Sequence, residues 1–178
     1  MSKILKQVYL NNKQQLMKKL LLFPVLFVCG VNVYGQSIRF NELVNFTALN
    51  NREVFDNLKQ GDSFRQDYTT EVNGQEIEYF KSIGAKANVE EINVGAFSRL
   101  NNGTMLRTVV YKSTNPQNVI NMIGQIKRFG LDLKFRGVDP SNNIYLYDSD
   151  FYHVSVYLRR DQTSGMIEIK QKEYLGLD

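Results

Sequence analysis

The chain contains a single histidine, His153, and two aspartates, Asp148 and Asp150, lie within five residues of it. A histidine held by a carboxylate is the general base of a hydrolytic triad, and the triad also needs a nucleophile. The Gly-x-Ser-x-Gly turn that presents a nucleophilic serine is absent from the sequence. We therefore predict no catalytic residues. A small hydrolase that uses His153 with Asp148 or Asp150 is the alternative.

The sequence also lacks the residues that would bind a metal ion or a cofactor. Cys29 is the only cysteine, whereas a structural zinc site usually draws on several Cys or His ligands. The sequence contains neither a P-loop motif nor a dinucleotide-binding glycine motif. The run Asp148-Ser149-Asp150 starts like a calcium loop but lacks the glycine and the distal glutamate of an EF-hand. We expect no metal site and no cofactor.

Paired carboxylates are a further candidate for acid–base chemistry. Glu90 and Glu91 are neighbours in a predicted strand, and successive side chains of a strand point to opposite faces. These two carboxylates therefore cannot act together on one substrate. Glu76 and Glu78 share a face, but they adjoin a predicted hairpin turn, where their expected role is to keep the hairpin soluble.

Aromatic residues in the last third of the chain suggest a binding surface. Alternation in residues 144–149 and 151–160 predicts one face beneath a helix, with Ile144 and Leu146 on it, and one opposite face rich in tyrosine. A solvated sheet face usually carries Thr, Lys and Glu, whereas aromatic and arginine side chains are typical of protein interfaces. The predicted partner-binding residues are Tyr145, Tyr147, His153, Tyr157 and Arg159. Strand propensity of tyrosine, or packing of this face on the first half of the chain or on a second copy, would explain the same pattern.

The elements that position these residues follow from periodicity. Phe40, Leu43 and Val44 have helical spacing, and a second short helix begins at an Asn50 cap and ends at Gly61, where glycine accepts the left-handed conformation. Strands are then predicted at residues 68–72, 75–83, 89–96 and 104–113, the first two joined by an Asn-Gly turn.

The second half of the chain repeats this order. Asn115-Pro116 opens a helix that ends at Gly130, and strands are predicted at residues 131–138, 144–149, 151–160 and 166–172. The period is about 65 residues. We predict an α+β fold of two consecutive helix-plus-antiparallel-meander units, with the helices packed on one face of antiparallel sheet.

This order of elements resembles the architecture of the β-lactamase inhibitor protein family. The resemblance covers residues 40–174 and rests on the order of the elements. In that family the two sheets form a concave surface that holds a protein partner, and disulfides join the lobes. The present chain lacks those cysteines, and none of the family's inhibitory residues aligns with it. The resemblance therefore implies a fold and a mode of binding, without naming the partner.

Charge is distributed unevenly along the chain. The whole sequence has 22 basic and 18 acidic residues and a pI near 9.1. Residues 1–35 hold five lysines and no acid, so residues 36–178 carry 17 basic and 18 acidic groups. The folded part is therefore close to neutral, which argues against a nucleic-acid partner.

The basic N-terminal segment reads as a secretory signal peptide. Lys18-Lys19 precedes the apolar run of residues 20–33, and Val33-Tyr34-Gly35 suits cleavage before Gln36. The start codon is Met1 or Met17. The run is shorter than the roughly 20 residues of a membrane-spanning helix and contains Pro24, which disfavours an uncleaved anchor. A lipoprotein acylated at Cys29 is also disfavoured, because the preceding residues are bulky.

The sequence thus predicts a signal peptide at residues 1–35, a first α+β unit at residues 36–113 and a second at residues 114–178. Whether the two units form one continuous domain is left open. The predicted function is that of an exported, periplasmic or secreted, non-catalytic protein-binding module of the bacterial envelope, with no membrane span after cleavage. A homodimer and a structural subunit of an envelope assembly remain alternatives.

Overall fold

The computed structural model describes residues 36–84 and 88–173. The chain divides between Gly35 and Gln36 into two units, and the second unit contains all the elements described below. The predicted signal peptide at residues 1–35 lies outside the described residues.

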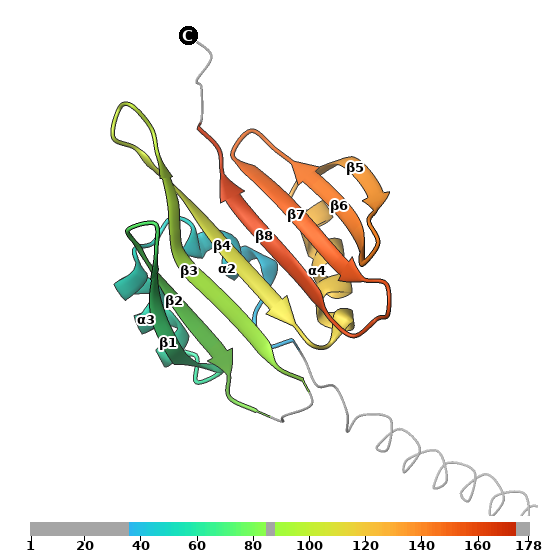
Figure 1. Cartoon of the computed structure of the whole chain (residues 1–178), viewed down its shortest axis with the longest axis horizontal. Helices are drawn as coiled ribbons and strands as arrows, with labels where there is room; N and C mark the ends of the chain where they lie inside the picture. The colour runs from blue at the N-terminus through green and yellow to red at the C-terminus, as the bar shows by residue number, and fades with distance from the viewer. Residues whose placement is uncertain (1–35, 85–87, 174–178) are drawn as a thin grey trace, which may run out of the picture. The chain divides into compact units, whose positions relative to one another are not determined.

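The described part of the chain contains helices and strands in the predicted order (Figure 1). The helices are α2 (Phe40–Phe46), α3 (Asn51–Gln60) and α4 (Pro116–Arg128). The strands are β1 (Phe64–Val72), β2 (Gln75–Ser82), β3 (Glu90–Arg99), β4 (Met105–Ser113), β5 (Asp132–Val138), β6 (Asn142–Asp148), β7 (Tyr152–Arg159) and β8 (Gly165–Gln171). The predicted fold class, α+β with two consecutive helix-plus-meander units, is confirmed.

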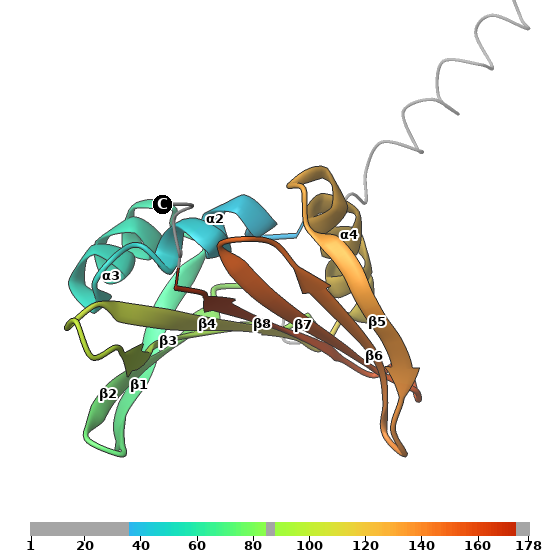
Figure 2. The ribbon, with the colours of Figure 1, turned by 90° about the horizontal axis from the view of Figure 1, so that it is seen from above.

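All eight strands belong to one antiparallel sheet in the order β1-β2-β3-β4-β8-β7-β6-β5. Each unit is a four-stranded meander, and the last strands of the two meanders pair with each other, with Val110 of β4 opposite Glu168 of β8. The two units therefore share one continuous sheet. Figure 2 shows that its outer hairpins curl away from the helices, so the face without helices is concave.

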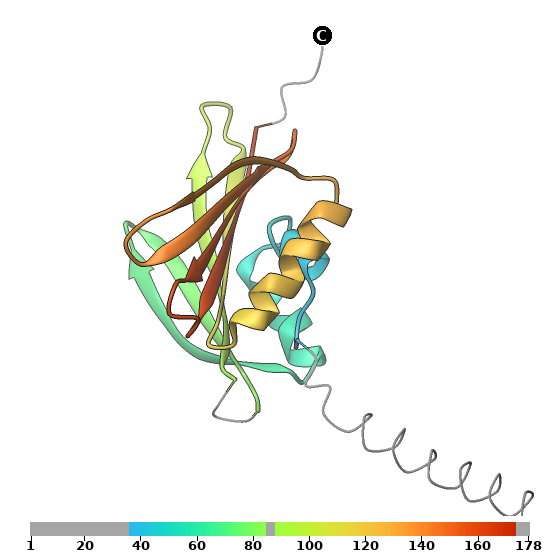
Figure 3. The same ribbon diagram turned by 90° about the vertical axis from the view of Figure 1, so that its right-hand side faces the viewer.

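The helices cover the other face of the sheet (Figure 3). In α4 the apolar stripe of Val119, Met122 and Ile126 is fully buried. The sheet meets it with alternate buried side chains, such as Ile167 and Ile169 of β8. The core is thus a single layer between the helices and the convex side of the sheet.

The helix ends follow the sequence signals with one exception. The Asn50 side chain accepts a hydrogen bond from the Glu53 amide, and the Glu53 carboxylate accepts one from the Asn50 amide, which confirms the predicted capping box. Gly130 is left-handed, with a φ of 91°. The helix ends at Gly61 as predicted, but the left-handed conformation expected there is wrong, because the φ of Gly61 is −74° and Asp62 takes that conformation instead, with a φ of 48°.

A buried carboxylate ties the start of the folded chain to the middle of the sheet. Glu90 is only 3% exposed. Its carboxylate accepts hydrogen bonds from the Ser37 amide (3.1 Å), the Ser37 hydroxyl (2.7 Å) and the Tyr111 hydroxyl (2.8 Å). Burial, and secondarily the nearby Glu90 charge, raises the pKa of Tyr111 far above its usual value. Tyr111 is therefore a permanent donor to Glu90.

Both edge strands carry a β-bulge at a charged residue. The register shifts around Asp67 in β1 and around Lys134 in β5. Bulges and charges on edge strands discourage pairing with another strand. The two free edges of this sheet are thus protected in the same way.

A third bulge, in β3, depends on a glycine. Gly95 has a φ of 105°, and a Cβ atom there would lie 2.0 Å from the Glu76 carbonyl oxygen and 2.9 Å from the Asn51 side-chain nitrogen. This contact with backbone leaves no space for a side chain. Gly103 also has a positive φ, of 87°, but a Cβ there would meet no atom within 4 Å.

We expect Gly95→Ala to lower the free energy of unfolding by about 3 kcal/mol or more, because strain and a backbone clash add together. Gly103→Ala, which adds strain without a clash, should cost about 1 kcal/mol. Urea unfolding followed by circular dichroism measures both values. Equal costs for the two variants would mean that the close approach at Gly95 does not constrain the bulge.

Candidate functional site

The concave face presents three of the five predicted partner-binding residues. Val154 and Val156 of β7 are buried beneath the helices, so the alternate residues His153, Tyr157 and Arg159 lie on the helix-free face. Tyr157 is half-buried, between Ile144 of β6 and Met166 of β8.

The predicted face is wrong for the other two residues, Tyr145 and Tyr147. Tyr145 pairs with Val156 and Tyr147 pairs with Val154, so both lie on the helix face. Tyr147 is 1% exposed, and Tyr145 packs against the core with the Arg136 guanidinium 5.5 Å from its ring centroid.

The error has a simple physical cause. In β6 both alternating sets of side chains are apolar, so the pattern alone does not say which set is buried. The tight connection after β6, where the Ser149 amide donates to the Tyr152 carbonyl, sets Asp148 opposite His153. That register places Ile144 and Leu146 on the concave face, where the pattern predicted Tyr145 and Tyr147.

Tyr147→Ala should lower the free energy of unfolding by about 3–5 kcal/mol, because it removes a large buried side chain. Tyr157→Ala, on the concave face, should cost about 1 kcal/mol or less. Urea unfolding of the two variants provides the comparison. A cost for Tyr157→Ala as large as that for Tyr147→Ala would contradict the assigned faces.

A cleft of about 500 Å³ opens on the concave face where β7, β8, β4 and β3 come together. Tyr157 and Met166 give it apolar surface, and Lys112, Arg159 and Glu91 give it charge. Its lining is completed by Val89, Ser113, Thr114, Asn142, Ser164 and Gly165. This cleft has the size and the mixed lining of a ligand site.

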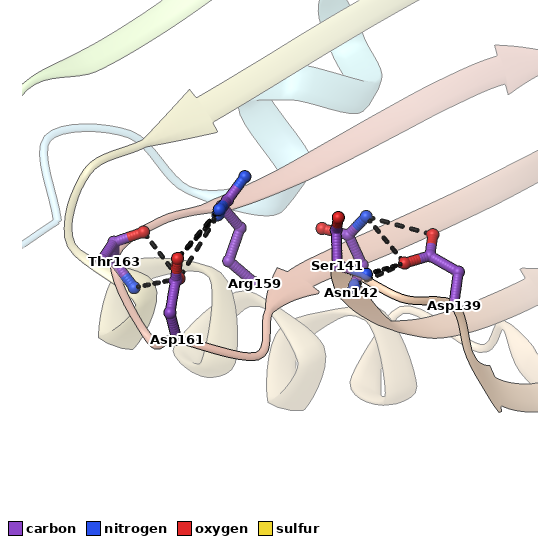
Figure 4. A network of polar contacts seen from close by, with 6 residues as sticks. All are labelled: Asp139, Ser141, Asn142, Arg159, Asp161 and Thr163. Atoms are coloured by element: carbon purple, nitrogen blue, oxygen red, sulfur yellow. Dashed lines mark hydrogen bonds and ion pairs between the residues drawn. The ribbon is translucent and has the colours of Figure 1, made fainter.

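Two turns hold polar side chains at one end of this cleft (Figure 4). Arg159 donates through Nε and Nη2 to the Asp161 carboxylate, with the shortest contact at 2.8 Å. Asp161 also accepts from the amide and hydroxyl of Thr163. These hydrogen bonds, that from Arg159 first, hold the pKa of Asp161 well below its usual range. The contact therefore stabilises the fold above the usual pKa of an aspartate and is lost on strong acidification.

The second turn fixes Asn142 in a similar way. Asp139 accepts hydrogen bonds from the amides of Ser141 and Asn142 and from the Asn142 side chain. These bonds, led by that from the Asn142 side chain, lower the pKa of Asp139. Because Asn142 pairs with Arg159 across β6 and β7, the two turns together order this rim of the cleft.

A second hollow, of about 320 Å³, lies on the first half of the concave face. Its lining residues carry no charge and are Val72, Asn73, Gln75, Ile77, Tyr79, Asn93, Val94, Ala96, Thr108 and Val110. Tyr79 stacks on Tyr68 with ring centroids 4.2 Å apart and an interplanar angle of 13°. The sequence did not predict this hollow, although Tyr68, Ile77 and Tyr79 lie on the two strands that flank the predicted Asn-Gly turn.

His153 contacts Asp148 but not Asp150. The Nδ1 atom of His153 lies 2.5 Å from Oδ1 of Asp148, and the Lys172 ammonium lies 2.9 Å from the other carboxylate oxygen. Among residues 36–84 and 88–173, no serine hydroxyl is hydrogen-bonded to His153, and no group of three or more metal-ligating side chains is found. The pair is thus a close contact between an imidazole and a carboxylate, with no nucleophile beside it in the described residues.

The helix side also has a hollow, of about 660 Å³, between α2 and α3. Two of its polar side chains are already engaged: Glu42 accepts from the Arg39 amide (2.7 Å), and the Asn57 side chain donates to the Glu53 carbonyl (2.7 Å). The concave face is therefore the stronger candidate site.

Within the described residues, no helix has the length and apolar character needed to cross a membrane. Comparisons of the chain with protein-family models, with curated proteins and with solved structures found no match. The resemblance to the β-lactamase inhibitor protein family stays a prediction based on the order of elements.

Proposed function

We propose that this protein is an exported, non-catalytic binding module of the bacterial envelope and that it holds a protein partner on its concave sheet face. The observation that carries the proposal is the apolar lining of a face that none of the helices α2, α3 and α4 covers. Tyr79, Ile144, Tyr157 and Met166 lie there half-buried, and aromatic and methionine side chains are enriched in protein interfaces.

The edges of the sheet support the same choice of surface. The charged bulges at Asp67 and Lys134 disfavour addition of a partner strand to β1 or β5. A partner is then expected to contact side chains of the concave face. The alternatives of a homodimer and of a structural subunit would use the same surface and differ only in the occupant.

Export is proposed from the sequence of residues 1–35. The folded unit begins at Gln36, the residue expected to follow the cleavage site. Ser37 is already engaged with the buried Glu90, so cleavage before Gln36 would leave these contacts in place.

Photo-crosslinking in envelope extract tests the binding face. A photoreactive phenylalanine derivative in place of Tyr157 should form a discrete adduct with a partner. The same derivative in place of Ile120, a 45% exposed residue of α4 on the other side of the sheet, should not. Adducts are resolved by gel electrophoresis and identified by mass spectrometry.

Adducts at position 120 alone, or none at either position, would refute the binding face. An adduct between two copies of the chain at position 157 would assign the face to a homodimer. Intact-mass measurement of the adduct distinguishes that case from a different partner.

A small envelope hydrolase is the second candidate, and the contact between His153 and Asp148 favours it. An imidazole beside a carboxylate is the base that such an enzyme needs. If it is correct, purified protein should hydrolyse peptide, ester or glycan substrates, and His153→Ala should reduce turnover by at least about 100-fold. Absence of turnover by the wild-type protein would dismiss this candidate.

A further inference from the structure

The two hollows of the concave face adjoin each other. On β4, Val110 lines the uncharged hollow and Lys112 lines the charged cleft; on β3, Asn93 and Glu91 are divided in the same way. Residues two apart on a strand share a face and lie about 7 Å apart. The hollow and the cleft are therefore successive parts of one groove across β2, β3, β4, β8 and β7.

The two ends of this groove differ in chemistry. The hollow is lined only by uncharged residues, with Ile77 and Tyr79 in its wall, and Tyr79 is part of a stacked pair of tyrosines. A further aromatic ring would find apolar area and ring edges there. The volume of about 320 Å³ accommodates one such side chain.

The cleft presents two cations whose charges are offset nearby: Glu91 lies opposite Lys112 across β3 and β4, and Asp161 pairs with Arg159. Its charged lining residues are Lys112, Arg159 and Glu91. Within the described residues, no carboxylate lies within 4.0 Å of the Lys112 ammonium. Arg159 is oriented by Asp161 through Nε and Nη2, which leaves Nη1 without a hydrogen bond in the part of the chain described. A carboxylate of a partner would accept hydrogen bonds from the Lys112 ammonium and from Nη1 of Arg159.

We propose that the groove selects a polypeptide segment of its partner that carries an aromatic side chain for the hollow and an Asp or Glu side chain for the cleft. This inference rests on the proposed function, since it specifies what the concave face binds. Five adjacent strands at about 4.8 Å spacing give a groove of about 19 Å, which an extended segment of about six residues spans.

Selection of displayed random 12-residue peptides on the purified protein tests the inference. The wild-type protein should enrich peptides with an aromatic residue and an acidic residue within about six positions of each other. Lys112→Glu should abolish the acidic preference and keep the aromatic one. Thr108→Arg, which places a charge in the hollow, should abolish the aromatic preference and keep the acidic one.

Matched controls on the far side of the sheet are Lys127→Glu and Asn121→Arg, both on exposed positions of α4. The affinity of one selected peptide, measured by fluorescence anisotropy, should fall about tenfold or more for each groove variant and less than about twofold for each control. Thermal unfolding verifies that every variant is folded, and Ala96→Lys replaces Thr108→Arg if the latter does not fold.

Three outcomes would overturn the inference: no enriched peptide, a consensus without either residue type, or the same consensus for wild type and both groove variants. If position 157 nevertheless crosslinks to a partner, the binding face stands, and only the proposed preference for aromatic and acidic side chains is wrong. If position 157 gives no adduct while peptides with both residue types are enriched, the groove chemistry stands and the envelope partner does not.

Discussion

The pairing of β4 with β8 is the constraint on which the rest of this structure depends. It joins the last strands of two meanders through six residue pairs, from Thr108↔Lys170 to Ser113↔Gly165. Neither meander alone has more than four strands. Only across this seam does the sheet become wide enough to curve around a groove while its helices cover one side. The seam also supplies Lys112 and Met166, which adjoin across it and line the charged cleft.

The two faces of the sheet differ: the convex face holds the core, and the concave face is the proposed recognition surface. The convex face buries the large apolar side chains against the helices, and Gly165 allows α4 to approach so closely that a Cβ atom there would lie 2.8 Å from Val119 Cγ2. The buried Glu90, held by Ser37 and Tyr111, joins this layer to the first residues of the fold. The concave face contributes little to this core and is free to carry aromatic and charged side chains.

Local sequence signals were sufficient for most elements. The Asn73-Gly74 turn, the Asn50 capping box and Pro116 at the first turn of α4 each depend on a few neighbouring residues, and each is present in the structure. The first strand was predicted to begin at residue 68, whereas β1 begins at Phe64. The cause is that residues 65–67 of this edge strand are polar on both faces. The left-handed residue after α3 was misassigned by one position, since an aspartate adopted the conformation expected of glycine.

The sequence by itself determined the α+β class, the order of the elements and the residues His153, Tyr157 and Arg159 of the concave face, because these depend on short-range periodicity. Only the tertiary structure decided which way Tyr145 and Tyr147 point, because β6 is apolar on both sides and its register comes from β7. The uncharged hollow and the charged cleft could also be found only from the tertiary structure. Each is assembled from strands that are distant in sequence, and their adjacency follows from long-range pairing that no local pattern encodes.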